Sequence, residues 1–172
     1  MVSITNPQRV YIALGSNIEQ PYVQIKKAIE ALATLDNTRV LADSGYYKSR
    51  PMGPADQPDY INAVVEVETS LLPQDLLHCC QQIEKQQGRV KKRHWGERCI
   101  DLDILLYAQQ QIQQAGLTIP HPGICERDFV FMPLLKIAPH IHIPGKGLLS
   151  EQVAQVKPAN ADYACLFTGK IQ

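Results

Sequence analysis

The sequence has little of what would direct a protein to a membrane or to a nucleic acid. None of its apolar runs approaches the roughly 20 residues that a membrane-spanning helix needs. The first residues, MVSITNPQR, lack the apolar core of a secretory signal and the arginine-rich pattern of an organelle presequence. Seventeen basic residues balance seventeen acidic ones, so no net charge draws the whole molecule to nucleic acid or anionic lipid. We therefore expect a cytoplasmic protein with no membrane and no nucleic acid as its partner.

Motifs that would identify a metal or nucleotide site by themselves are also missing. The five cysteines are odd in number and include no CxxC pair, which favours neither a disulfide framework nor a zinc site. The patterns GxxxxGK and GxGxxG are absent, so the turn at 15–17 is not a nucleotide-binding glycine loop. Any anion or nucleotide site must therefore be local and of another kind.

The pattern of apolar residues predicts an α+β fold in a single domain spanning residues 1–172. The chain is 172 residues long, and we place the core at about 9–145, whereas the tail at about 157–172 shows no clear pattern. The expected order is strand, helix, strand, strand, helix, strand, at 10–14, 21–35, 39–47, 60–67, 73–88 and 99–106. This is the order of a ferredoxin-like βαββαβ sandwich, in which two helices cover one face of an antiparallel sheet and the other face stays available for ligands. Extra C-terminal elements are expected as short helices near 129–137 and 149–156.

The segment at 49–59, SRPMGPADQPD, is predicted to be a binding loop. It holds three prolines and a glycine between two expected strands. Long ordered loops inside compact domains are often functional.

Asp101 and Asp103 are the strongest candidates for chemistry. They stand two apart in an expected strand, so both carboxylates leave the same face, with α-carbons roughly 6.5 to 7 Å apart. In the apolar stretch CIDLDILLY they need a countercharge, which Mg²⁺ bridging to a substrate phosphate would supply. The alternative is that they pair with nearby arginine or lysine at a sheet edge, and the two aspartates alone do not decide between these interpretations.

A basic segment directly before the two aspartates favours the metal interpretation. Within GRVKKRHWGER stand Arg89, Lys91, Lys92, Arg93, His94 and Arg98. Cations beside paired carboxylates are the arrangement expected for gripping a polyphosphate whose metal the carboxylates hold. The only tryptophan, Trp95, lies in this polar segment and is predicted to stack on a planar ring.

Two further residues are ambiguous from spacing alone. Glu84 follows apolar Ile83 late in an expected helix and is, by this pattern, an ordinary surface glutamate. His121 lies between two prolines and could donate to a phosphate or stabilise a turn.

Taken together, several separated motifs resemble those of the 6-hydroxymethyl-7,8-dihydropterin pyrophosphokinases. They are ALGSN at 13–17, RPMGPADQPDYINAV at 50–64, GRVKKRHWGERCIDLDILLY at 88–107, and IPHP with RDFVFMPL within 119–134. The likeness spans roughly residues 10–144, and several motifs in one order are far more specific than any one of them. The resemblance implies a ferredoxin-like enzyme of folate biosynthesis that transfers pyrophosphate from ATP to the hydroxymethyl group of a reduced pterin and releases AMP. It implies ATP as co-substrate, two Mg²⁺ ions as cofactors, and small molecules as partners of what we expect to be a monomer.

The resemblance also implies roles for individual residues. Asp101 and Asp103 match the magnesium ligands and, with Arg89 and Arg98, the catalytic positions. Positions of the ATP site match Gln81, Glu84, Lys91, Lys92, Trp95, Ile104, Thr118, His121 and Arg127. Positions of the pterin site match Ser49, Arg50, Met52, Tyr60, Asn62, Trp95 and Phe129. Whether Asp103 also accepts the proton of the substrate hydroxyl stays open.

The chain departs from the family pattern in the basic segment. His94 stands where members usually carry arginine, Glu97 where they carry proline, and the segment is one residue shorter. ATP affinity or loop closure is expected to differ. These departures motivate one rival hypothesis, an inactive small-molecule sensor. A second rival, an RNA-binding module, is disfavoured by the zero net charge and by the absence of an aromatic-rich RGFGFV-type strand.

Overall fold

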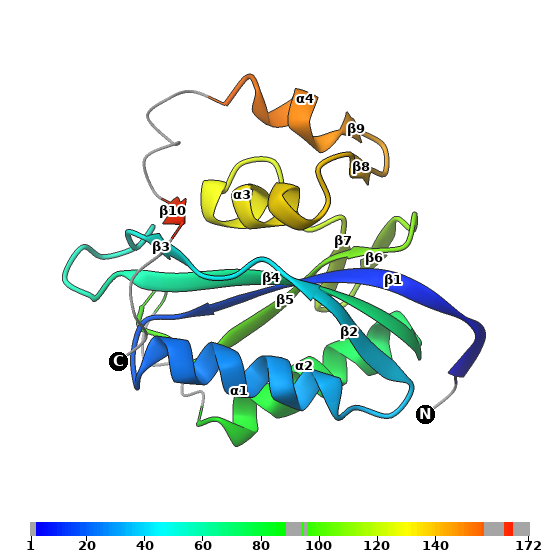
Figure 1. Cartoon of the computed structure of the whole chain (residues 1–172), viewed down its shortest axis with the longest axis horizontal. Helices are drawn as coiled ribbons and strands as arrows, with labels where there is room; N and C mark the ends of the chain where they lie inside the picture. The colour runs from blue at the N-terminus through cyan, green and yellow to red at the C-terminus, as the bar shows by residue number, and fades with distance from the viewer. Residues whose placement is uncertain (1–2, 89–93, 95, 157–163, 167–172) are drawn as a thin grey trace.

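The structure, a computed structural model, describes residues 3–88, 94, 96–156 and 164–166. Its centre is an antiparallel sheet of β1 (Ser3–Ser16), β2 (Thr38–Asp43), β3 (Tyr47–Ser49), β4 (Tyr60–Leu71), β5 (Asp101–Tyr107) and β10 (Ala164–Leu166). The strand order is β10-β3-β4-β1-β5, and β2 pairs with β4 beside β3 (Figure 1). With helices after β1 and β4, this is the predicted ferredoxin-like βαββαβ arrangement, which is confirmed.

Two helices cover one face of the sheet, as the apolar spacing predicted (Figure 1). The helices α1 (Pro21–Ala33) and α2 (Pro73–Gln86) both begin with proline, which suits a first turn that needs no backbone donor. Each buries one stripe, Ile25, Ala28 and Leu32 in α1 and Leu76, Cys80 and Ile83 in α2. The stripes pack on the sheet residues that alternate with the cleft-facing ones, and together they form the larger core. In the described part of the chain, every helix is too short or too polar to cross a membrane.

The strand predicted at 39–47 is interrupted, and this prediction was wrong in detail. β2 ends at Asp43 and β3 begins at Tyr47, while Gly45 adopts a positive φ of 71°. Asp43 pairs with Val65, and Tyr47 pairs with Asn62. Between these two pairs, the segment from β2 to β3 contains one residue more than β4 does. The extra residue is a bulge, which turns the strand and directs β3 toward the open end of the sheet.

The second face of the sheet is not open along its whole length, which corrects the expectation that it stays available for ligands. A register shift places Ile104 opposite Ile12 and Leu106 opposite Tyr11, so that Leu105 is inserted and joins Leu106 in the second core. These apolar side chains need cover, which the helix α3 (Asp128–Ile137) supplies from above (Figure 1). A cleft lies at the end of this face, near the start of β5 and the end of β1.

Smaller elements complete the fold after β5. Two short hairpins are formed by β6 (Ile112–Gln114) with β7 (Leu117–Ile119), and by β8 (His142–Ile143) with β9 (Gly147–Leu148). The helix α4 (Leu149–Val153) packs against α3 and confirms the short C-terminal helix predicted near 149–156. β10 falls within the tail to which the sequence assigned no structure, and it pairs with β3.

Candidate active site

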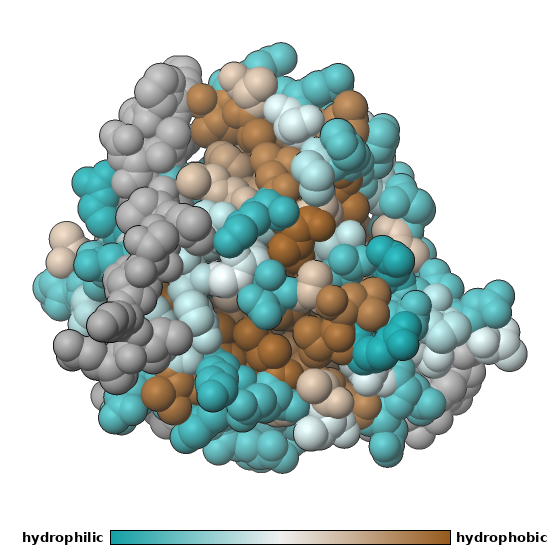
Figure 2. Space-filling model, in the orientation of Figure 1, coloured by the Kyte–Doolittle hydropathy of each residue, from teal (hydrophilic) through white to brown (hydrophobic). Residues whose placement is uncertain are grey.

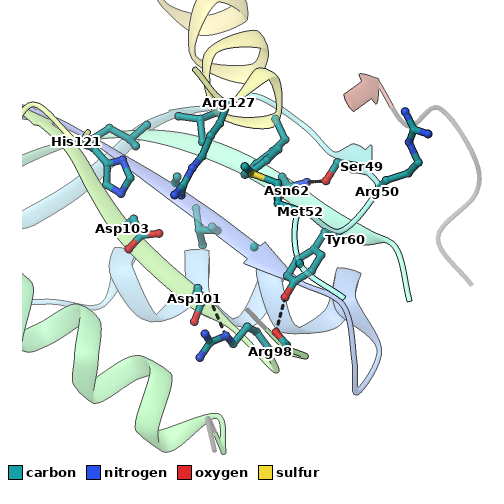
Figure 3. A pocket seen from close by; sticks show the side chains of 18 residues that line it. Ser49, Arg50, Met52, Tyr60, Asn62, Arg98, Asp101, Asp103, His121 and Arg127 are labelled. Atoms are coloured by element: carbon teal, nitrogen blue, oxygen red, sulfur yellow. Dashed lines mark hydrogen bonds and ion pairs between the residues drawn. The ribbon is translucent and has the colours of Figure 1, made fainter. Parts of the chain in front are cut away.

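A cleft of about 860 Å³, measured with its open mouth, lies on the face of the sheet that α3 partly covers. Backbone at the end of β1 forms its floor, with residues of α3 on one side and the 49–59 loop on another (Figure 3). Residues that the sequence analysis assigned to the site line it as follows: Ser49, Arg50, Met52, Tyr60, Asn62, Arg98, Asp101, Asp103, His121, Arg127 and Phe129. The cleft therefore gathers side chains that stand up to 80 residues apart in the sequence.

One end of the cleft is acidic and holds Asp101 and Asp103 on one face of β5 (Figure 3). Arg98 Nε lies 3.6 Å from Asp101 Oδ2, which is a long ion pair. With the described residues, the exposed Asp103 carboxylate makes no hydrogen bond or ion pair. Among the described residues, arginine pairing therefore applies to Asp101 and not to Asp103, and the pair as a whole has the oxygen donors that suit Mg²⁺ with substrate phosphates.

Arg98 is enclosed at this end of the cleft, with 13% of its side chain exposed. Its Nη1 atom is buried and makes no hydrogen bond with the described residues. Burying an arginine donor without an acceptor is costly. Arg98 lines the cleft, and the phosphate role that the resemblance implied for it stays a prediction.

His121 and Arg127 face the aspartates from the opposite side of the cleft (Figure 3). Burial lowers the pKa of His121 below its ordinary value of 6.5, and Arg127 lowers it further while Asp103 opposes the shift. Nδ1 of His121 accepts the N–H of Gly123 at 3.0 Å, so the neutral ring carries its proton on Nε2 and can donate it. Gly123 is also required for space, because a Cβ there would lie 2.7 Å from Nε of Arg127.

The other end of the cleft is built from β3, β4 and α3 and suits a flat polar ring. Asn62 donates from Nδ2 to Ser49 Oγ at 2.8 Å, which fixes its amide group (Figure 3). Opposite Asn62 in the register, a Cβ on Gly15 would meet its Oδ1 at 3.3 Å, so this glycine leaves room for the Asn62 side chain. Phe129 adds an aromatic wall. Ile61 and Ala63 are buried on the helix side, which confirms that Tyr60 and Asn62 share the ligand face.

Tyr60 connects the two ends of the cleft. Its Oη donates to the carbonyl oxygen of Gly96 at 2.9 Å (Figure 3). Burial, and secondly the charge of Asp101, raise the pKa of Tyr60 to about 12. The phenol is therefore a neutral hydrogen-bond donor across the physiological pH range.

Four of the assigned residues lie outside the cleft lining. Gln81 is exposed on α2, Thr118 is half-buried in β7, and the side chain of Ile104 is in the core between sheet and helices. Glu84 corrects the spacing-based expectation of a surface residue, since it is only 4% exposed. Its Oε1 accepts the backbone N–H of Leu102 at 2.7 Å, at the outer edge of β5 between the two aspartates.

Most of the basic segment lies outside the residues that the structure describes. Arg89, Lys91, Lys92 and Trp95 lie outside the described residues. Of the same segment, His94 is described and exposed, and Arg50, on the other loop, points away from the aspartates (Figure 3). The roles assigned to the site residues, inside and outside the described part of the chain, all stay predictions.

Two residues that maintain the shape of the cleft were not predicted from the sequence as site residues. Asn17 is buried directly after β1 and bonds to both Arg98 and the 49–59 loop. Gly123 makes room for Arg127. Both stand next to quoted motifs or within them, but an asparagine and a glycine carry no charge or ligand pattern that would have identified them.

The face of the molecule seen in Figure 2 mixes polar and apolar patches. Figure 2 shows apolar residues gathered between the α3 layer and the helix layer below the sheet, with polar residues around them. Among the described residues, Met52 on the 49–59 loop is the one large apolar side chain that is mostly exposed, at 51%.

Comparison with known proteins gives one consistent result. Residues 11–139 match the family model described as 7,8-dihydro-6-hydroxymethylpterin-pyrophosphokinase. A 2-amino-4-hydroxy-6-hydroxymethyldihydropteridine pyrophosphokinase of Haemophilus influenzae is 50% identical over 145 residues, covering 84% of this chain and 91% of that protein. A protein of the same name from Pseudomonas aeruginosa is 44% identical over 162 residues, covering 94% of each chain.

Solved structures agree on the fold. The wild-type HPPK-DHPS of Plasmodium falciparum with pteroate superposes with a TM-score of 0.69 at 14% identity, covering 90% of this chain. An HPPK-DHPS in complex with substrates gives a TM-score of 0.68 at 13% identity, covering 87% of this chain. In each case the chain spans 43% of the longer protein. At such low identity the likeness shows the fold alone.

Proposed function

The chain belongs to the 7,8-dihydro-6-hydroxymethylpterin-pyrophosphokinase family, and we propose that it performs the reaction of this family in the cleft between β5, α3 and the 49–59 loop. The reaction transfers pyrophosphate from ATP to 6-hydroxymethyl-7,8-dihydropterin in folate biosynthesis. One observation supports the assignment of the site. A single cleft has acidic and cationic side chains at one end and suits a polar ring at the other end.

The residues of the ring end orient the pterin. The amide of Asn62 is fixed by its bond to Ser49, and its remaining hydrogen-bonding groups bind the polar edge of the ring. Phe129 packs against the face of the ring. This places the hydroxymethyl group toward Asp101 and Asp103. Holding two reactants in one geometry removes much of the entropic cost of their encounter.

The residues of the charged end hold the triphosphate. The guanidinium group of Arg127 and the ring of His121 lie above the two aspartates, and Arg98 lies on the other side of Asp101 (Figure 3). Charge-assisted hydrogen bonds from such donors stabilise the negative charge that shifts to the leaving AMP. His121 contributes a hydrogen bond from Nε2.

Asp101 and Asp103 fit a magnesium site. Their oxygens face the cleft, and Mg²⁺ commonly takes one or two carboxylates together with substrate phosphates. When bound there, Mg²⁺ neutralises phosphate charge and lowers the pKa of a coordinated hydroxyl. We assign two ions to the pair. We also propose that the enzyme is a cytoplasmic monomer with one domain, that it has no nucleic-acid partner, and that the basic segment closes over ATP.

A single assay tests the function. Purified protein is incubated with ATP, Mg²⁺ and 6-hydroxymethyl-7,8-dihydropterin, and AMP is measured with and without the pterin. We expect pterin-dependent AMP release, reduced by about 1,000-fold in Asp103→Asn, which keeps the side-chain volume and removes the charge. Asp36→Asn, an exposed aspartate remote from the cleft lining, is the control. AMP release at the wild-type rate in Asp103→Asn would refute the metal assignment, and binding of both substrates without AMP release would favour the inactive sensor.

A further inference from the structure

The side-chain amide of Asn17 makes three hydrogen bonds, with both of its N–H groups and its oxygen engaged. It follows directly after β1 and is 2% exposed. Oδ1 accepts the backbone N–H of Arg98 at 2.8 Å. Nδ2 donates to Oε1 of Gln57 and to the carbonyl oxygen of Pro58, both at 3.0 Å. One buried amide therefore bonds to two segments that stand about 40 and about 80 residues further along the chain.

The orientation of this amide is determined by its partners. The backbone nitrogen of Arg98 can only donate and the carbonyl oxygen of Pro58 can only accept, so the two ends of the Asn17 amide cannot be exchanged. The backbone N–H of Asn17 also donates to the carbonyl oxygen of Arg98 at 3.0 Å. Asn17 and Arg98 are thus joined by two hydrogen bonds. Because these bonds fix the position of Oδ1, the Nδ2 group can point only toward the 49–59 loop.

The two segments that Asn17 joins belong to opposite ends of the cleft. Arg98 lies beside Asp101 at the charged end. Gln57 and Pro58 belong to the 49–59 loop, whose earlier residues line the ring end. Gln57 is buried and is itself fixed, because its Nε2 donates to the carbonyl oxygen of Pro54 at 3.0 Å.

We propose that Asn17 is a positioning residue that fixes the 49–59 loop relative to the Arg98–Asp101 pair, and thereby the pterin relative to the triphosphate. This inference rests on the proposed function for the identity of the two ligands. Asn17 lies outside the cleft lining, so it acts through its partners and not by contact with a substrate. The Tyr60 bond to Gly96 is a second link between the same two segments.

The chemistry of the amide allows one arm of this link to be cut separately. Asn17→Asp keeps an acceptor for the N–H of Arg98 but has no N–H for Gln57 and Pro58. Asn17→Ala removes both arms. Gln57→Met keeps the length of the side chain and removes its bond with Asn17, together with the bond that Gln57 donates to Pro54 within the loop. Asn6→Asp, at an exposed position, is the control for the added charge.

The test measures binding of each ligand by titration calorimetry. The probes are Mg²⁺ with α,β-methylene-ATP, which cannot release AMP, and 6-hydroxymethyl-7,8-dihydropterin added to that complex. For Asn17→Asp we expect the Kd of the nucleotide to stay within twofold of wild type and the Kd of the pterin to rise about tenfold. Asn17→Ala should raise both, and Gln57→Met should raise the pterin Kd in the wild-type background but have less effect when combined with Asn17→Asp.

For Asn17→Asp, equal changes in both Kd values, or no change in either, would overturn the proposal, because a purely structural role only lowers the fraction of folded protein. If Asn17→Asp does not fold, the pterin-selective effect of Gln57→Met decides the matter in the same way. A separate measurement of AMP release distinguishes a failure of this proposal from a failure of the proposed function. A wild-type protein that binds both probes but releases no AMP from ATP contradicts the function, while the two Kd values still decide the role of Asn17.

Discussion

Replacing Glu84 tests whether a buried carboxylate holds the edge of β5 in place. Glu84 Oε1 accepts the N–H of Leu102 at 2.7 Å, and Leu102 stands between the two aspartates. Glu84→Gln keeps the length of the side chain and an oxygen acceptor but removes the charge. Glu84→Met keeps the length and removes the acceptor, so that the buried N–H of Leu102 is left without it.

The magnitude follows from the energy of a hydrogen bond to a charged group. Such a bond contributes about 1.5–3 kcal/mol, and a buried donor without its acceptor costs a similar amount. Since methionine recovers part of this by apolar burial, we expect Glu84→Met to lower the free energy of unfolding by about 2 kcal/mol. For a domain of this size, about 2–4 °C of melting temperature corresponds to each kcal/mol, so the expected shift is about 4–8 °C. Glu84→Gln should lower it by roughly half as much.

Calorimetry and amide hydrogen exchange measure the two consequences. We expect the melting temperatures to fall in the order wild type, Glu84→Gln, Glu84→Met, and the amide of Leu102 to lose protection most in Glu84→Met. Glu30→Gln on α1 is the matched control, because this side chain is 64% exposed and its ion pair with Lys26 is long, at 3.9 Å. A Glu84→Met protein that melts within 2 °C of wild type and keeps Leu102 protected would show that the bond does not hold β5.

Three further predictions concern other parts of the cleft and core. Tyr60→Phe removes the bond to Gly96 and should lower the melting temperature by about 2–4 °C, the effect of a bond of about 1 kcal/mol; an unchanged thermogram would contradict it. Gly123→Ala places a Cβ 2.7 Å from Arg127 and should raise the KM for ATP about tenfold, the effect of losing one charge-assisted contact, whereas an unchanged KM would show that Arg127 does not hold ATP. Burial raises the pKa of the Cys80 thiol above its ordinary value of 9.0, so iodoacetamide at pH 8 should label half-buried Cys125 before Cys80 in native protein, as peptide mass spectrometry would show. Since the raised pKa favours the protonated thiol in the folded state, its contribution to stability is complete below pH 9.0 and is lost as the pH rises above it; melting temperatures that rise between pH 9 and 10 would contradict this sign.

Local patterns predicted the residues of the cleft well where alternation along a strand decided the outcome. Asp101 with Asp103, and Tyr60 with Asn62, reach the same cleft because residues two apart in a strand share a face. The pattern failed where a bulge changed the alternation. Simple alternation along the strand places Leu105 on the face of the aspartates and Leu106 on the opposite face. Both residues instead belong to the second core, because one residue of β5 is inserted opposite β1.

Glu84 shows why burial of a polar side chain escapes sequence reasoning. Its spacing in α2 is that of a residue at the border of the apolar stripe, and such a position is buried or exposed according to what packs against it. The N–H of Leu102 comes from a strand 18 residues away and provides the partner that makes burial possible. A single-sequence pattern contains no information on that encounter.

By itself, the sequence determined the order of strands and helices, the paired carboxylates and the family to which the chain belongs, because these depend on residue type and on spacing within one segment. The tertiary structure decided which face α3 covers, that Arg98 lies against Asp101, and that Asn17 joins the loop to the charged end. These contacts unite residues that are distant in the chain, and their geometry is set only when the sheet and its helices pack together.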